Sequence, residues 1–298
     1  MIHGERLKGV LYMLGASVCL STGGLLVRLV ESTPPAALVV WRCVVMFLFL
    51  AALLGVRHGR SLVAKVHSGG RPGAISAMFL AATFGLFIFA VTRTSVANAA
   101  ALMSTGPLML TVAAWAFLGE KPRSATWLAI AAALGGIALM FADGIGSGGV
   151  ITGNLLALCI PASFTVSYIL LRRSPARLDP TNTSMLAALF AAIAVLPFAW
   201  PVAWPTQDLP VILTMGVAQT GMGLALMSQA INRLTAGELG MVGLLEMALA
   251  PVWVWLVLGE RPADAALAGG AIVVGAVFLN QLYALRTPRG KRSANAVL

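Results

Sequence analysis

Ten long runs of apolar residues follow one another along the chain, separated by short segments marked by charged residues, glycine and proline. Each run approaches the roughly 20 residues that an α-helix needs to cross the hydrocarbon core of a bilayer. The pattern predicts an all-α polytopic membrane protein with ten transmembrane helices. The predicted spans are 10–28, 36–55, 73–92, 96–117, 124–142, 153–171, 183–203, 211–231, 236–258 and 264–285.

Charged residues are too scarce for a soluble protein. The 298 residues are 59% hydrophobic and 10% charged, whereas a soluble domain carries roughly 25% charged residues. This composition excludes a soluble enzyme. The spans also use most of the chain, which leaves no room for a sizeable domain outside the membrane.

The distribution of basic residues predicts the orientation in the membrane. With the N-terminus inside, sixteen of the 20 Lys and Arg residues fall in inside segments, three fall outside, and Arg42 lies within a span. Lys and Arg are enriched in cytoplasmic loops. The sequence therefore predicts a multi-pass protein of the bacterial inner membrane with both termini in the cytoplasm. The net charge of +10 then reflects topology and not a nucleic-acid partner.

An internal repeat divides the chain into two halves. One motif occurs twice, 140 residues apart, as Trp-x-x-Leu-Gly-Glu-Lys-Pro at 115–122 and Trp-x-x-Leu-Gly-Glu-Arg-Pro at 255–262. The predicted halves, 1–146 and 147–298, each hold five spans. Because five is odd, the second half enters the membrane in the opposite sense. Inverted repeats of this kind are typical of secondary transporters, with the binding site near the midplane between the halves.

These features resemble the drug/metabolite transporter superfamily, EamA type. The resemblance covers the whole chain and is carried by the two Leu-Gly-Glu-[Lys/Arg]-Pro motifs, by Trp41-Arg42 early in the second span, and by the ten-span repeat. It implies export of amino acids and other small metabolites, and within the superfamily it favours the YddG-like aromatic amino acid exporters. One departure is Glu246-Met247, where members of the family often have Glu-Pro.

Two ionisable residues lie inside predicted spans, and each has alternative roles. Glu246 is near the middle of the ninth span, where an unpaired charge costs several kcal/mol. It is predicted to bind a substrate ammonium or to couple transport to protons, or else to link helices structurally, with Arg42 as one partner. Arg42 is assigned, with Glu246, to gating or coupling. It is predicted to meet a substrate carboxylate, or to extend its head group to the outer interface.

Aromatic and polar residues within other spans suit an amphipathic ligand. For each of them, packing between helices or contact with lipid is the alternative to ligand binding. Gly106-Pro107 in the fourth span predicts a kink. The predicted substrate-binding residues besides Glu246 are Phe79, Tyr168, Gln219, Trp41, Phe84, Met222 and Trp253, with Phe87 beside them on the third span.

Glu120 and Glu260 end spans in the repeated motif. They are predicted either to act as gating or coupling carboxylates, or to stabilise the start of the following helix through its dipole. The sequence contains no Walker A motif and no His-Glu-x-x-His motif, and no histidine lies in a predicted span. We therefore expect no enzyme activity, cofactor or metal.

The hypothesis that best fits the sequence is a secondary transporter that exports small metabolites, above all neutral and aromatic amino acids, by alternating access. The alternative is a membrane-embedded protein that handles lipid or serves as a structural partner. Expected partners are a small-molecule substrate and the lipid bilayer, and no nucleic acid.

Overall fold

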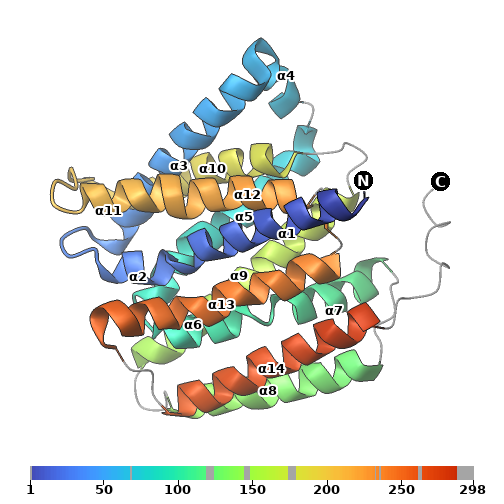
Figure 1. Ribbon diagram of the computed structural model, residues 1–298. Coiled ribbons are helices and arrows are strands. Elements are labelled where there is room, and N and C mark those ends of the chain that lie inside the picture. The colour runs from blue at the N-terminus through green and yellow to red at the C-terminus, as the bar shows by residue number, and fades with distance from the viewer. Residues whose placement is uncertain are drawn as a thin grey trace.

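A computed structural model describes residues 2–67, 69–118, 124–143, 148–173, 179–231, 233–234, 236–260 and 264–286. Every regular element in these ranges is a helix (Figure 1). The elements are α1 (Ile2–Ser21), α2 (Gly23–Arg28), α3 (Pro35–His58), the 3₁₀ turn η1 (Gly59–Ser61), α4 (Leu62–His67), α5 (Gly70–Val91), α6 (Val96–Met103), α7 (Gly106–Leu118), α8 (Ser124–Asp143), α9 (Gly148–Arg173), α10 (Pro180–Ala199), α11 (Leu209–Thr214), the π-helix η2 (Met215–Met222), α12 (Gly223–Ile231), α13 (Ala236–Leu258) and α14 (Asp264–Arg286).

The predicted apolar runs are confirmed as membrane-spanning candidates in large part. Seven stretches of the described chain are long and apolar enough to cross a bilayer. Three shorter apolar helices lie within the fifth, ninth and tenth predicted spans, at Ser124–Leu139, Val242–Leu258 and Leu267–Asn280. The chain is thus a multi-pass membrane protein, and the count of ten crossings stays a prediction.

Local sequence sets where several helices begin. Asp179 precedes α10 and accepts a hydrogen bond from the backbone N–H of Thr181 at 2.8 Å, while Pro180 takes the first helical position, where no N–H is needed. Ser95 caps α6 in the same way, accepting from the N–H of Asn98 at 3.1 Å. These side chains satisfy N–H groups that a helix leaves unpaired at its start.

The predicted kink at Gly106-Pro107 is confirmed. Helix α6 ends at Met103 and α7 begins at Gly106, because Pro107 lacks an N–H and its ring clashes with the preceding turn. The hydroxyls of Ser104 and Thr105 donate to the carbonyls of Ala101 and Leu102 at 2.6 and 2.7 Å. The break therefore leaves both hydroxyls satisfied inside an apolar bundle.

Helix pairs relate the two halves of the chain. At one side of the bundle α3 packs on α10, and at the other side α8 packs on α14 (Figure 1). Between them α5 packs on α9, and α1 packs on α12. In terms of the predicted spans, the second span contacts the seventh and the fifth contacts the tenth. The third span contacts the sixth, and the first contacts the eighth. Exchanging the two halves maps this set of pairs onto itself.

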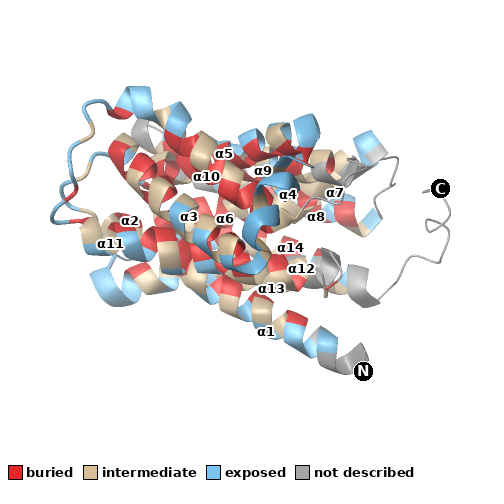
Figure 2. Ribbon diagram, turned by 90° about the horizontal axis from the view of Figure 1, so that it is seen from above, coloured by how far each residue is buried: buried red, intermediate tan, exposed pale blue. Residues whose placement is uncertain are grey.

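Buried residues follow the interior of the bundle, and exposed residues cover α4 and the outer faces (Figure 2). The repeated motif lies only partly within the described ranges. Residues 119–123, with Glu120, and residues 261–263 fall outside them. Glu260 is described, and its carboxylate oxygen lies 3.7 Å from Nε of Arg28. This ion pair joins the end of α2 to the end of α13.

A close contact between α8 and α14 yields a first prediction. A Cβ added to Gly136 would lie 2.6 Å from the carbonyl oxygen of Gly269, whereas one added to neighbouring Gly135 would meet nothing within 4 Å. We expect Gly136→Ala to destabilise the protein by about 1–3 kcal/mol, because backbone atoms cannot move aside. Gly135→Ala is the matched control and should be neutral or slightly stabilising, since alanine favours helix. Thermal unfolding in detergent compares the two, and equal midpoints would contradict this close approach of α8 to α14.

Candidate functional site

Glu246 lines a small cavity between helices of both halves of the chain. The cavity volume is about 20 Å³, room for roughly one water molecule. Its other lining residues come from α1, α2, α5, α6 and α13: Leu20, Ser21, Gly24, Phe87, Val91, Val96, Ala99, Ala100, Met103, Met247 and Ala250. No described residue donates a hydrogen bond to the Glu246 carboxylate or forms an ion pair with it. The predicted intramembrane carboxylate thus faces a cavity without a protein partner in the described chain.

Trp253 fixes one wall of this site. Its indole Nε1 donates to Oγ of Ser21 at 2.9 Å, and that hydroxyl donates to the carbonyl of Val18 at 2.8 Å. Helix α1 ends at Ser21, where the chain turns into α2. The contact therefore holds α13 against the break between α1 and α2, about two turns along α13 from Glu246.

Gln219 approaches the same break from the π-helix η2. Its Nε2 donates to the carbonyl of Leu20 at 3.3 Å, and its Oε1 accepts from the hydroxyl of Thr220. A Cβ added to Gly23 would lie 2.9 Å from Nε2 of Gln219 and 3.2 Å from Cζ of Phe87. Glycine at position 23 is thus what allows the amide and the ring to approach the chain break.

Arg42 is buried behind Phe87. The residue is 2% exposed, and its Nη2 donates a hydrogen bond to the carbonyl of Phe84 at 2.8 Å. The guanidinium carbon lies 5.8 Å from the centre of the Phe87 ring and 5.9 Å from that of Phe84, within the range of a cation–π contact. Within the described part of the chain, the Nε of Arg42 has no hydrogen-bond partner. This burial disagrees with the alternative prediction that Arg42 extends its head group to the outer membrane interface.

Phe87 is thus close to both intramembrane ionisable residues. It lines the Glu246 cavity and also contacts the Arg42 guanidinium. No ion pair between Arg42 and Glu246 is present among the described residues, so the structural link considered from sequence is not seen. A buried ion normally requires compensation by a partner. A ligand that carries both charges would supply it.

The other predicted residues are spread over the bundle. Phe84 is buried against Arg42. Trp41 stacks edge-on with Trp204 at 4.9 Å between ring centres, and its Nε1 donates to the carbonyl of Ala203 at 3.1 Å. Phe79 and Met222 are 39% and 41% exposed, and Tyr168 is partly buried on α9. None of these five lines the Glu246 cavity as the structure describes it.

Sequence reasoning missed a carboxylate that joins the two halves. Asp208, before α11, is 3% exposed. It accepts five hydrogen bonds of 2.6–3.0 Å from residues 31–33: the backbone N–H groups of all three and the hydroxyls of Ser32 and Thr33. Burial acts to raise the pKa of Asp208, but these bonds outweigh it and hold the pKa well below its ordinary value of 3.8. We call this contact the Asp208 latch.

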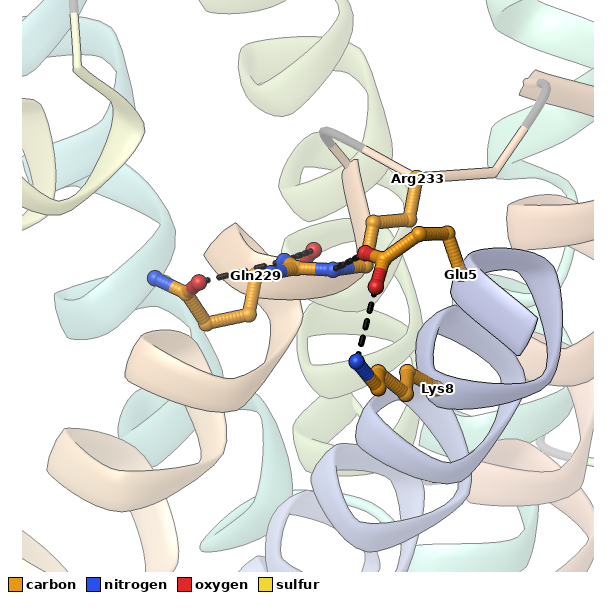
Figure 3. Close-up of polar contacts among 4 residues, drawn as sticks. All are labelled: Glu5, Lys8, Gln229 and Arg233. Atoms are coloured by element: carbon orange, nitrogen blue, oxygen red, sulfur yellow. Dashed lines mark hydrogen bonds and ion pairs between the residues drawn. The ribbon is translucent and has the colours of Figure 1, made fainter. Parts of the chain in front are cut away.

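A second, more exposed polar contact lies at the opposite end of α1 (Figure 3). Glu5 accepts from Nζ of Lys8 at 2.8 Å and from Nε of Arg233 at 3.2 Å. Arg233 also donates to the backbone and side-chain oxygens of Gln229 at 2.7 and 3.1 Å. The hydrogen bond from Lys8, followed by that from Arg233, lowers the pKa of Glu5. Such exposed contacts are weak compared with the buried Asp208 latch.

In the internal repeat, the helix break of the first half corresponds in position to Glu246 of the second half. At the spacing of 140 residues, Gly106-Pro107 corresponds to Glu246-Met247. The first half thus has a broken helix, and the second half has an unbroken α13 that carries the carboxylate. Within the described ranges, no group of three His, Cys, Asp or Glu side chains could hold a metal ion.

Comparisons with known proteins agree with this architecture. The chain is 26% identical over 228 residues to the uncharacterized transporter YwfM of Bacillus subtilis (strain 168), covering 74% of this chain and 75% of that one. It is 24% identical over 264 residues to an uncharacterized transporter of Vibrio cholerae serotype O1, covering 85% of each. A crystal structure with 20% identity shares the fold with a TM-score of 0.63 over 94% of this chain and 99% of that one.

A family model accounts for both halves. The EamA-like transporter family matches residues 7–142 and again residues 151–282. One match lies within each of the two predicted halves of the chain. This chain, a multi-pass membrane transporter, belongs to the EamA-like transporter family.

Proposed function

We propose that this transporter exports small zwitterionic metabolites, above all neutral and aromatic amino acids. The observation that carries the proposal is the pair of ionisable groups that have no ionic partner in the described chain, Glu246 and Arg42, both of them close to Phe87. An amino acid offers an ammonium for Glu246 and a carboxylate for Arg42. Its side chain would meet Phe87, Met103 and Met247 in the cavity lining. The finer assignment to aromatic, YddG-like exporters rests on the resemblance and on Phe87 in the cavity lining.

Transport would proceed by alternating access between two inverted five-helix halves. The self-consistent helix pairs support this proposal, since inverted halves can exchange conformations and so open the site to either side. A cavity of about 20 Å³ is too small for an amino acid. Phe87 must therefore move before Arg42 and Glu246 can contact one ligand. We propose that this side chain separates the two residues until the substrate binds.

The proposed orientation has both termini in the cytoplasm of a bacterial cell. The start of α1 and the end of α14 lie at the same end of the bundle (Figure 1), as an even number of crossings requires. The basic segment 57–71 is expected at this cytoplasmic end. The Asp208 latch then closes the outer end, and the exposed Glu5–Arg233 contact lies at the inner end.

Flux into proteoliposomes tests the substrate class. We expect vesicles that hold the purified protein and unlabelled amino acids to exchange them for labelled neutral or aromatic amino acids. Because recognition needs both charges, the amine and the carboxylic acid analogues of a transported amino acid should compete at least about tenfold more weakly. Protein-free liposomes give the background. Absence of flux for all amino acids would refute this class and favour the alternative of a lipid-handling or structural membrane protein.

A further inference from the structure

A second, larger cavity shares no lining residue with the Glu246 cavity and lies at the basic end of the bundle. Its volume is about 510 Å³, within the range of pockets that hold drug-sized ligands. It lies between the end of α3, α4, the start of α5 and the first half of α10. Nothing in the transport proposal uses this cavity.

One wall of the cavity carries a lysine and two histidines. Lys65 and His67 line it from α4, and His58 lines it from the end of α3. The Nδ1 atoms of His58 and His67 donate to the carbonyls of Leu54 and Val63 at 3.2 and 3.1 Å. The Nε2 atom of each ring then accepts a hydrogen bond in the neutral form and donates one in the protonated form. The segment 57–71 has four Lys and Arg residues and no acidic residue. Basic segments beside a spanning helix attract phospholipid phosphates.

The opposite wall carries a buried acceptor without a donor. Asn182 on α10 is 8% exposed, and its Oδ1 has no hydrogen-bond partner among the described residues. Asp179 and Thr183 line the cavity beside it. An unsatisfied buried acceptor destabilises the protein. A ligand with an N–H or O–H donor on its head group would satisfy it.

The wall formed by α10 changes from polar to apolar with depth. Asp179, Asn182 and Thr183 lie in its first turn, and Leu186 and Phe190 follow one and two turns further in. The distance from the first to the last of these residues is roughly 16 Å along the helix axis. Such a gradient matches an amphiphile whose head lies at the rim and whose hydrocarbon chain extends inward along the helix.

The end of α3 and helix α4, which line the cavity, also lie where lipid is expected. Helix α4 and the end of α3 stand apart from the other helices (Figure 1), and α4 is largely exposed (Figure 2). Val56 and Val63 on this segment are 89% and 67% exposed. Exposed valines beside basic residues are typical of segments at the boundary between head groups and acyl chains. A lipid is therefore a better match to this site than a small soluble molecule.

We propose that the cavity between α4 and α10 binds a membrane phospholipid whose head group carries both a phosphate and a terminal hydrogen-bond donor. Lys65 donates to the phosphate, as do the histidines in their protonated form, and Oδ1 of Asn182 accepts from the donor. Phosphatidylethanolamine supplies an ammonium and phosphatidylglycerol supplies hydroxyls, whereas phosphatidylcholine has no such donor. The bound lipid would hold α4 against α10.

Lipid binding to the purified full-length protein tests the proposal. Delipidated protein in detergent is mixed with phosphatidylethanolamine, phosphatidylglycerol or phosphatidylcholine of identical acyl chains, and native mass spectrometry counts the lipids retained. We expect one lipid per chain to be retained at least about tenfold better for one or both of the first two. Equal retention of all three lipids would overturn the proposal.

Variants assign the site. Lys65→Gln and Asn182→Leu should each reduce the retention of the preferred lipid about tenfold. Arg57→Gln is the matched control, because it removes one charge from the same segment without lining the cavity, and it should retain the lipid. Lys65 is exposed, so this variant reports binding even if Asn182→Leu folds poorly. If Arg57→Gln reduced lipid retention as much as Lys65→Gln does, the assignment of the lipid to this cavity would be overturned.

A soluble head group separates a lipid from a free solute. Glycerophosphoethanolamine at millimolar concentration has the same phosphate and ammonium but no acyl chains. We expect it to leave the retained phosphatidylethanolamine in place. Displacement at that concentration would show a site for small solutes and would overturn the assignment to lipid. This result does not depend on amino acid flux, so the two proposals fail independently.

Discussion

Glu246→Gln is expected to lower amino acid flux at least about tenfold in proteoliposomes, with little change in the amount of folded protein. The substitution keeps the shape of the side chain but removes the negative charge that would meet a substrate ammonium. A hydrogen bond to a charged group contributes about 1.5–3 kcal/mol, and about 1.4 kcal/mol corresponds to a factor of ten. Because no described residue bonds to the Glu246 carboxylate, the variant leaves no protein partner unsatisfied.

The same variant separates the alternative roles of Glu246. Retained flux that no longer depends on pH would indicate proton coupling and not substrate binding. Flux equal to that of the parent protein at every pH would dismiss both roles. Glu31→Gln is the matched control, since its side chain is exposed outside the predicted spans, and it should transport normally. An equal loss in this control would mean that general charge effects cause the result.

The sequence predicted features that depend on local composition. Apolar runs predicted the helices, because a spanning helix satisfies its own backbone and needs only length and hydropathy. Pro107 predicted a break within the fourth span, since no helix interior supplies its missing N–H. Glu246 was identifiable as a candidate because a carboxylate within an apolar run is costly wherever that run packs.

The sequence could not predict which face of each helix points inward. In water, polar residues mark the outer face, but lipid and helix interior are both apolar. Phe79, Phe84 and Phe87 all lie on α5 and looked equivalent, yet Phe79 is exposed, Phe84 is buried and Phe87 lines the cavity. Roughly 100° of rotation per residue separates these faces. The burial of Arg42 likewise depends on a carbonyl 42 residues away.

The Asp208 latch was hidden for the same reason, and its removal carries the second large prediction. Its donors lie 175 to 177 residues away in sequence, at Glu31, Ser32 and Thr33. We expect Asp208→Asn to destabilise the folded protein by about 2–4 kcal/mol, because the amide loses the charge and sets an N–H group against existing donors. Chemical unfolding in detergent at neutral pH measures the loss. Thr33→Val, which removes one hydroxyl of the five donors, should cost about 1 kcal/mol.

The dependence of this loss on pH identifies the carboxylate as its cause. Hydrogen bonds lower the pKa of Asp208 in the folded protein below its ordinary value of 3.8. Its contribution to stability is therefore complete above about pH 4 and fades as the pH falls further toward the folded pKa. The difference between the parent protein and Asp208→Asn should thus be constant from about pH 7 to about pH 5 and shrink below about pH 4. A difference that shrinks already near about pH 6 would contradict a latch made by Asp208. Glu31→Gln keeps the backbone N–H that bonds to Asp208, so it should show the parent profile.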